Sequence, residues 1–469
     1  MAPIPDLLAS SVDSPFTIHN IPFGVISSDT QATPRCATAI GEYAIDLVAF
    51  AAEDRLGHVL GPGAETIFSQ PCLNTFAALG RATRRAVRDV LIQSIRANHV
   101  PSRCLIPLAN VTMHLPFRIG GFSDFYCSLE HVQNYSRVKV LADDTKCSPM
   151  AAGAAIPDNW FYAPSVYNSR VSSVVPSPQP IRRPRGVYYD GDGNPAYGPS
   201  REVDYELEMG VFVSQPVKHG EELAIEHVEE HIFGFVLLND WSSRDLQIFE
   251  MKPLGPFHSK GSSCPPPGLL LQGKFVDLTK PPVRFRDLNL PMGSHPGGSG
   301  TVQMPPKTTQ SPAPFDHLKW PGSNGTFDIH LEIDLIRSGK THHMASSNLR
   351  YLYWTPFQQL AHHASAACGL GSGDLIGTGT ISGDKGSTVG PLQHVDSGGK
   401  KTELGCLYEA TQAGSKDVEL ADGTRMQYLQ DGDEIVLKGS CGQRDGNRPY
   451  IGFGECRGIL LPARKQKVG

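Results

Sequence analysis

The sequence predicts a mainly β fold with some α-helix, divided into two domains. Its 48 Gly and 38 Pro among 469 residues are about one and a half times the usual share, which indicates many turns between short strands. Apolar and polar residues also alternate with a period of two in several stretches, as in half-buried strands. A chain of this length is long enough for two or three domains. We expect two, residues 1–115 and 116–469.

The first domain is expected to combine short strands with one helix. Residues 15–50 alternate apolar and turn-forming residues, which favours a small barrel or sheet. Apolar residues then recur at helical spacing between Phe76 and Val90. The arginines of this segment fall on the opposite side, and we interpret them as an exposed helix face rather than a phosphate site: Arg81, Arg84, Arg85 and Arg88.

The second domain is expected to contain longer strands. In residues 203–213, alternation places Asp204, Glu206 and Glu208 on one strand face. A buried strand, 231–240, ends in Asp240, and a helix is expected to follow at once. Asp240, Arg244 and Gln247 would then share one helix face.

Two further segments complete the expected outline. Residues 349–367 resemble an amphipathic helix, in which the adjacent His362 and His363 form a core or capping pair. Residues 277–325 are rich in Pro, Gly, Ser and Thr and predict a long surface excursion.

Charge and cysteine content narrow the function class. The 42 basic and 47 acidic residues nearly balance, so the sequence shows no basic footprint for nucleic acid or an anionic membrane. No apolar stretch is long enough to span a bilayer, and we recognise no signal segment. Ten cysteines without a Cys-x-x-Cys pair favour reduced thiols. These features predict a cytoplasmic protein with a small-molecule partner.

The residue types indicate hydrolytic chemistry around a cation. The segment Ser123–His131 holds an acid, a phenol and an imidazole: Asp124, Tyr126 and His131. Together with Glu206, Glu208 and Asp240, Asp124 would give an all-oxygen ligand set, which suits Mg²⁺ or Ca²⁺ and disfavours zinc.

Simpler interpretations of these residues stay open. Glu206 and Glu208 are equally compatible with a solvated sheet face, and Asp240 with a helix cap paired to Arg244 at the surface. Lys260 could be catalytic or simply exposed. Known nucleophile and nucleotide motifs are absent: there is no Gly-x-Ser-x-Gly, and Gly377–Gly383 lacks dinucleotide spacing, although Thr380 there offers a hydroxyl.

Several motifs together resemble the fumarylacetoacetase family in order and spacing. They are Ser123–His131, Glu206-Leu-Glu208, Asn239–Gln247, Pro253–Phe257, Gly379–Gly383 and Asp431-Gly-Asp-Glu434. The resemblance extends from Asn20-Ile-Pro-Phe-Gly-Val25 to Gly452-Phe-Gly-Glu-Cys456. It implies an N-terminal SH3-like barrel, a C-terminal mixed β-roll and a homodimer.

The resemblance also implies a role for each site residue. The metal ligands would be Asp124, Glu206, Glu208 and Asp240. His131 would activate water, supported by Glu409, and Arg244, Gln247 and Lys260 would stabilise developing negative charge. The substrate, a β-diketone, would contact Tyr126, Tyr167 and Thr380. The implied reaction is hydrolysis of 4-fumarylacetoacetate to fumarate and acetoacetate, at the end of tyrosine and phenylalanine breakdown.

The sequence departs from the family pattern near the expected substrate. Val166-Tyr-Asn-Ser-Arg170 stands where the family has Gly-Tyr-His-Gly-Arg, and Met251 stands where a substrate-contacting tyrosine is usual. Cys264 falls in another altered run, and Arg137 and Lys139 are the candidates for a substrate-binding arginine. Two alternatives therefore stay open: a hydrolase of another acylpyruvate or β-diketone, and a diverged paralogue without catalytic activity.

Overall fold

The structure is a computed structural model, and it describes most of the chain. The described residues are 5–143, 156–260, 269–271, 276–277, 303–304, 308–321, 325–383, 402–442 and 450–465. The predicted excursion at 277–325 lies largely outside these ranges. In α6 (Leu129–Asp143) the backbone is described throughout, but the side chains only as far as Ser136.

The N-terminal part is built on an antiparallel five-stranded sheet, in the order β4-β3-β2-β1-β5. The strands are β1 (Phe23–Ser28), β2 (Gln31–Ile40), β3 (Tyr43–Asp46), β4 (Leu105–Pro107) and β5 (Val111–His114). Five helices are inserted between β3 and β4: α1 (Leu47–Ala52), α2 (Gly57–Leu60), α3 (Ala64–Phe68), α4 (Asn74–Ala77) and α5 (Arg81–Arg96). The short strands predicted for 15–50 are thus confirmed. The helix predicted between Phe76 and Val90 is divided, because α4 ends at Ala77 and α5 begins at Arg81.

The prediction of a solvated arginine face on this helix was wrong for two of its four residues. Arg84 and Arg88 are 1% and 2% exposed. Arg84 donates to the carbonyl oxygens of Ala77 and Leu79, and Arg88 donates to those of His19 and Asn20 at 2.8 and 2.6 Å. A guanidinium group can be buried because its donors are taken up by backbone acceptors.

The C-terminal part contains two large sheets. The first has the order β7-β6-β22-β13-β14-β16-β8, with β17 also paired to β14. Its strands are β6 (Phe122–Phe125), β7 (Val166–Asn168), β8 (Val175–Pro176), β13 (Leu207–Val213), β14 (Ile232–Asp240), β16 (Leu269–Leu271), β17 (Val276–Asp277) and β22 (Leu375–Gly377).

The second large sheet has the order β21-β20-β25-β26-β9. Its strands are β9 (Ile181–Arg182), β20 (His330–Arg337), β21 (Lys340–Asn348), β25 (Glu434–Cys441) and β26 (Ile451–Leu461). Among the described residues, four small pairs complete the strands: β10 (Arg185–Tyr189) with β11 (Pro195–Pro199), β12 (Val203–Asp204) with β15 (Ser242–Ser243), β18 (Gln303–Met304) with β19 (Thr326–Phe327), and β23 (Val418–Glu419) with β24 (Arg425–Met426). The fold is therefore mainly β with some α, as predicted.

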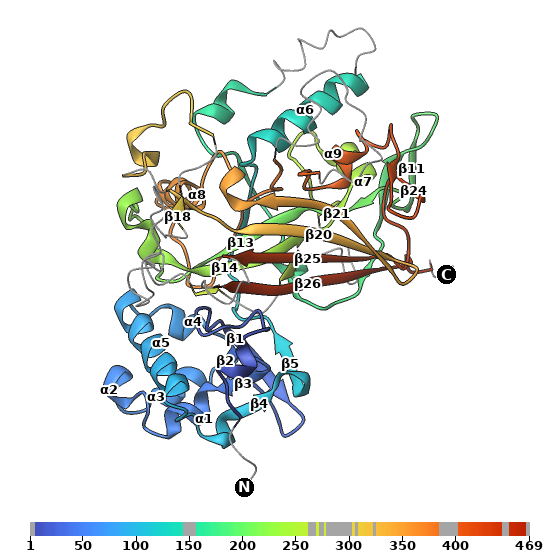
Figure 1. Cartoon of the computed structure of the whole chain (residues 1–469). Helices are drawn as coiled ribbons and strands as arrows, with labels where there is room; N and C mark the ends of the chain where they lie inside the picture. Colours follow the sequence, from blue (N-terminus) through green and yellow to red (C-terminus); the bar gives the residue numbers. More distant parts are fainter. Residues whose placement is uncertain are drawn as a thin grey trace, which may run out of the picture.

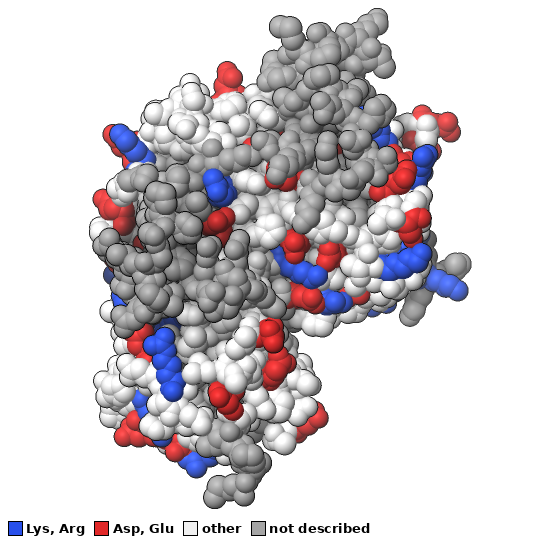
Figure 2. All heavy atoms as spheres, in the orientation of Figure 1, with Lys and Arg blue, Asp and Glu red and all other residues white. Residues whose placement is uncertain are grey.

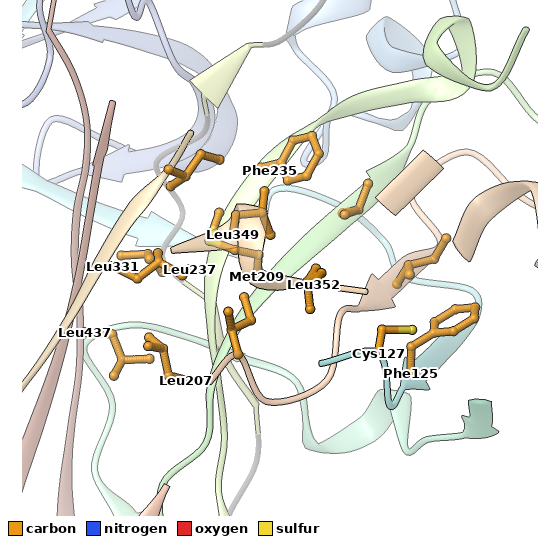
Figure 3. Close-up of a cluster of buried hydrophobic side chains, with 14 of the residues drawn as sticks. Phe125, Cys127, Leu207, Met209, Phe235, Leu237, Leu331, Leu349, Leu352 and Leu437 are labelled. Atoms are coloured by element: carbon orange, nitrogen blue, oxygen red, sulfur yellow. The ribbon is translucent and has the colours of Figure 1, made fainter. Parts of the chain in front are cut away.

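The eight-stranded sheet separates two apolar cores. Met209 and Leu237 point from β13 and β14 toward Leu331 of β20 and Leu437 of β25 (Figure 3). The alternate residues, including Phe212 and Leu238, belong to the core shared with the N-terminal part. Figure 1 shows that part below the sheets, with α6, α7 (Arg244–Glu250) and α9 (Leu407–Ala410) toward the opposite end.

Helix boundaries differ from the prediction in two places, each for a local reason. The helix predicted at 349–367 is α8 (Pro356–Ala364), because Pro356 opens it and Thr355 and Gln358 form a capping box. The helix after Asp240 begins only at Arg244, because Ser242 and Ser243 pair with β12. Asp240 therefore ends a strand and does not share a helix face with Arg244 and Gln247.

Surface charge agrees with the composition. Acidic and basic side chains are interspersed over the described face in Figure 2. Within the described residues, no helix has the length and apolar character needed to cross a membrane.

Candidate active site

Three buried carboxylates meet on neighbouring strands of the eight-stranded sheet. Asp124 comes from β6, Glu208 from β13 and Asp240 from the end of β14, and their ligand atoms lie within 4.8 Å of one another. On β22, which lies between β6 and β13, Gly377 is opposite Asp124. A Cβ atom at Gly377 would lie 2.8 Å from Asp124 Oδ1 and 3.2 Å from Glu208 Oε2. The glycine therefore leaves the space that the carboxylates occupy.

The charge of this cluster is only partly balanced. Burial raises the pKa of Asp124, Glu208 and Asp240, and repulsion from neighbouring carboxylates adds to this, although Lys260 opposes it. Asp124 Oδ1 and Glu208 Oε1 are buried without a hydrogen-bond partner among the described residues. Tyr167 donates to Asp124 Oδ2 at 2.5 Å, and the Gly379 N–H donates to Glu208 Oε2 at 3.1 Å.

These features fit a hard divalent cation. All three side chains offer oxygen ligands, as Mg²⁺ and Ca²⁺ prefer, and two ligand oxygens have no other described partner. A divalent charge would also offset the repulsion that raises the three pKa values. The donor chemistry does not distinguish Mg²⁺ from Ca²⁺.

Glu206 lies beside this cluster but is paired with basic side chains. Arg244 Nη1 lies 2.6 Å from Glu206 Oε1, and Lys260 Nζ donates to Glu206 Oε2 at 2.7 Å and to Asp240 Oδ2 at 2.5 Å. Burial alone would raise the pKa of Glu206, but attraction to Lys260 and Arg244 outweighs it and lowers the pKa. Glu206 is 4% exposed and Lys260 5% exposed. The solvated-face and exposed-lysine interpretations are therefore wrong.

A residue without a role in the sequence prediction, Asp204, anchors Arg244. Its buried carboxylate accepts from Arg244 Nε at 2.8 Å and from the backbone N–H groups of Leu407 and Tyr408 at 2.7 and 2.9 Å. Asp204 thus joins Arg244 to the start of α9, the helix that carries Glu409. The surface pair considered between Asp240 and Arg244 does not form, because Asp204 and Glu206 hold the guanidinium group.

His131 and Glu409 form a second buried group. His131 is on α6, and its Nδ1 lies 2.8 Å from Glu409 Oε2, off the direction in which the ring N–H would donate. Asn134 and Ser382 each donate to Glu409 at 2.8 Å. Burial would raise the pKa of Glu409, but attraction to His131 and these hydrogen bonds lower it. The carboxylate is therefore held in its charged form beside the imidazole.

The predicted substrate contacts surround these two groups. The Tyr126 ring lies edge-on to the His131 ring at 5.2 Å, and its buried hydroxyl has no hydrogen-bond partner among the described residues. Tyr167 contacts Asp124, and Thr380 is 2% exposed in the segment after β22. Gln247 Oε1 accepts from Arg244 Nη1 at 3.0 Å.

The structure brings most predicted site residues together and adds several others. The additional residues are Asp204, Asn134, Ser382, Cys406, Tyr135 and Tyr408. Tyr135 stacks on Tyr408 at 4.9 Å and lies 6.2 Å from the His131 ring. Strand alternation had drawn attention to Asp204 without giving it a role, and the others come close only through folding. The side chains of Arg137 and Lys139, and Cys264 altogether, lie outside the described residues.

Comparisons with known proteins cover nearly the whole chain. Residues 19–116 match the family described as Fumarylacetoacetase N-terminal, and residues 121–458 match Fumarylacetoacetate (FAA) hydrolase C-terminal. The fumarylacetoacetase of Aspergillus fumigatus is 36% identical over 471 residues, with 97% of each chain covered. The human fumarylacetoacetase is 36% identical, with 96% of this chain and 97% of that protein covered. For the Dictyostelium discoideum fumarylacetoacetase the identity is 35%, and both chains are covered completely.

Proposed function

This chain belongs to the fumarylacetoacetase family, and we propose that it hydrolyses 4-fumarylacetoacetate to fumarate and acetoacetate. The observation that carries the proposal is the buried pair of His131 and Glu409, joined through Asp204, Arg244, Glu206 and Lys260 to a cluster of three carboxylates. This arrangement provides a base, His131, and an ammonium group, Lys260, that can stabilise an oxyanion. Both belong to the same network as the proposed metal site.

His131 is the proposed base. The negative Glu409 lies against Nδ1, which favours the tautomer with its proton on Nδ1 and leaves Nε2 as the acceptor. Nε2 would take a proton from water as the water oxygen attacks the carbonyl carbon of the fumaroyl part, next to the carbon–carbon bond that breaks. Glu409 would then stabilise the imidazolium ion, because its carboxylate is negatively charged and lies 2.8 Å from Nδ1.

Two side chains are placed to stabilise the oxyanion that follows. Lys260 has three ammonium protons, and its bonds to Glu206 and Asp240 use two of them. Gln247 accepts from Arg244 through Oε1, which leaves its NH₂ group as a donor. Arg244 itself is committed to Asp204 and Glu206, so its proposed task is to position them.

Cleavage then completes the reaction. The carbon–carbon bond breaks as the oxyanion re-forms a carbonyl, the bonding electrons pass to the acetoacetate carbon, and the imidazolium returns its proton to that carbon. A divalent cation, Mg²⁺ or Ca²⁺, held by Asp124, Glu208 and Asp240 with Glu206 beside them, would supply Lewis-acid polarisation of diketone oxygens. Tyr126, Tyr167 and Thr380 are the proposed substrate contacts.

A related substrate is the second candidate. Met251, which follows α7, is half-buried and offers no hydroxyl to a carboxylate. At the other altered run, the Arg170 guanidinium lies 3.9 Å from the centre of the Phe257 ring. These side chains favour a changed preference for the group remote from the bond that breaks, because the base and the carboxylates are retained.

One assay separates these candidates. We would follow the loss of diketone absorbance of fumarylacetoacetate and of acylpyruvates, with and without Mg²⁺, for wild type and His131→Ala. The proposal predicts metal-dependent turnover of fumarylacetoacetate that the substitution abolishes. A higher kcat/KM for an acylpyruvate would favour the second candidate, and no turnover of any diketone would sink the enzyme proposal.

The assembly and location follow the same family assignment. We propose a cytoplasmic homodimer whose residues 1–115 form an SH3-like domain and 116–469 the catalytic domain. Sedimentation of the purified protein tests the dimer, and a monomer throughout the working concentration range would refute it.

A further inference from the structure

A second group of potential metal ligands includes His131, the proposed catalytic base. The donor atoms of His131, Cys406 and Glu409 lie within 4.8 Å of one another, and all three residues are buried. Unlike the carboxylate cluster, this group combines an imidazole, a thiol and a carboxylate. Such mixed nitrogen, sulfur and oxygen ligands suit zinc and similar cations, and not Mg²⁺ or Ca²⁺.

The geometry is already close to that of a three-ligand site. Cys406 Sγ lies 3.3 Å from Glu409 Oε2, and His131 Nδ1 lies 2.8 Å from the same oxygen. Metal bonds of roughly 2.0 to 2.3 Å in a tetrahedral arrangement place neighbouring ligands about 3.3 to 3.8 Å apart. Small side-chain shifts would therefore bring all three donors onto one cation.

The backbone holds these ligands in place. Cys406 is the N-cap of α9 and Glu409 lies three residues later, so the two side chains come from one short helical turn. Asp204 accepts from the N–H groups of Leu407 and Tyr408 between them, and Cys406 also forms a β-bridge with Glu206. His131 enters from the separate helix α6. The site does not depend on an undescribed segment.

Two neighbouring atoms indicate that the group is incompletely satisfied. The contact of His131 Nδ1 with Glu409 is not aligned as a hydrogen bond, although the atom is buried. The hydroxyl of Tyr126, whose ring packs against His131, is also buried without a partner among the described residues. A cation bound by the three ligands would take the unaligned His131 Nδ1 atom as a ligand, and the Tyr126 hydroxyl would lie near its open fourth position.

We propose that His131, Cys406 and Glu409 bind a zinc-class cation that inhibits the enzyme. On binding, the thiol releases its proton to solvent and the cation takes the Nδ1 lone pair, so the ring proton moves to Nε2. The Nε2 atom then carries a proton and cannot accept one from water. Inhibition rests on the proposed function, whereas binding does not.

Cadmium is the probe, because its bond to a thiolate gives an ultraviolet charge-transfer band. The intact protein is saturated with Mg²⁺ to fill the carboxylate cluster and titrated with Cd²⁺. Absorbance is recorded up to one equivalent, and turnover is recorded up to half inhibition of each variant. Wild type should show the band together with inhibition. Cys406→Ser should lose the band and need at least about tenfold more Cd²⁺ for half inhibition relative to its own uninhibited rate.

Two further variants make the result decisive. Cys368 is the exposed cysteine of the described residues, and Cys368→Ser should behave as wild type. His131→Ala should retain the thiolate but bind Cd²⁺ at least about tenfold more weakly by the same band. A band that persists in Cys406→Ser, a band lost in Cys368→Ser, or inhibition that excess Mg²⁺ removes equally in wild type and Cys406→Ser would overturn the proposal. A band in a protein without diketone turnover would leave this site standing while the proposed function fails.

Discussion

Glu409→Gln tests the pairing on which the mechanism depends. The substitution keeps the shape of the side chain and the oxygen that accepts from Asn134. The new NH₂ group can donate to the Ser382 hydroxyl, which in wild type donates to the other carboxylate oxygen. What is lost is the charge 2.8 Å from His131 Nδ1. Two unit charges about 4 Å apart interact by about 4 kcal/mol at an effective dielectric constant of about 20. Because the imidazolium forms only during the reaction, kcat should fall by about a thousandfold. Diketone absorbance measured with Mg²⁺ at saturating substrate gives this value.

The same substitution has a pH signature. Without the carboxylate the imidazolium is less stable, so the acid limb of the kcat/KM profile should move to lower pH. The thermal midpoint serves as the control for folding and should change little. A folded Glu409→Gln enzyme that keeps kcat within threefold of wild type, with an unmoved acid limb, would refute the role given to Glu409.

Three other predictions concern the cation site and a half-buried acid, Glu202. Gly377→Ala should weaken Mg²⁺ activation at least about tenfold, because the added Cβ would crowd Asp124 and Glu208. Gly191→Ala is the control, because the space around that glycine is open. Equal Mg²⁺ activation curves for the two variants would contradict the prediction. Chelation of the cation should abolish turnover, and it should lower the thermal midpoint more at pH 8 than at pH 5. The pKa values of Asp124, Glu208 and Asp240 are raised, so these acids can become neutral at the lower pH and then repel one another less. An equal fall in thermal midpoint at both pH values would argue against this. Glu202→Gln should stabilise the protein at pH 8 and not at pH 5. Burial, and then repulsion from Asp245, raises the pKa of Glu202 to about 7, so ionising this group in the folded protein at a pH above its unfolded-state pKa costs up to about 3 kcal/mol. Urea unfolding of both proteins at the two pH values measures this, and an equal free energy of unfolding at pH 8 would contradict it.

The sequence was most informative where chemistry and local spacing coincide. Alternation correctly predicted strand at Asp204 and at Glu208, but it could not show that Glu206 is 4% and Glu208 0% exposed. Burial depends on segments from elsewhere in the chain, such as Lys260 and Arg244 beside Glu206 and Gly379 beside Glu208, which come close only in the folded protein. The prediction of one strand with all three carboxylates on one face was wrong, because Asp204 lies in β12, Glu208 lies in β13, and residues 205–206 between them belong to neither strand.

Contacts between distant segments were beyond local patterns. Asp204 binds the backbone of residues 407 and 408, two hundred positions later, and no periodicity encodes that pairing. Arg84 and Arg88 were misplaced for a similar reason. Helical spacing put them on the polar, exposed side of the helix, but both are buried because main-chain oxygens accept their hydrogen bonds. Only the resemblance to a family associated His131 with Glu409, and the 2.8 Å contact agrees with that association.

The position of the site on its sheet explains why the N-terminal part belongs to the enzyme without supplying the chemistry. Asp124, Glu208 and Asp240 alternate with the inward residues of their strands, so they share a face with Phe122, Phe212 and Leu238. The sheet is apolar where the N-terminal part covers it, as the contacts of Phe23 and Phe76 with Phe233 at 6.3 and 6.1 Å show. At the three carboxylates the same face is acidic. Covering the apolar residues keeps the strands in register, and strand register sets the separation of the three carboxylates.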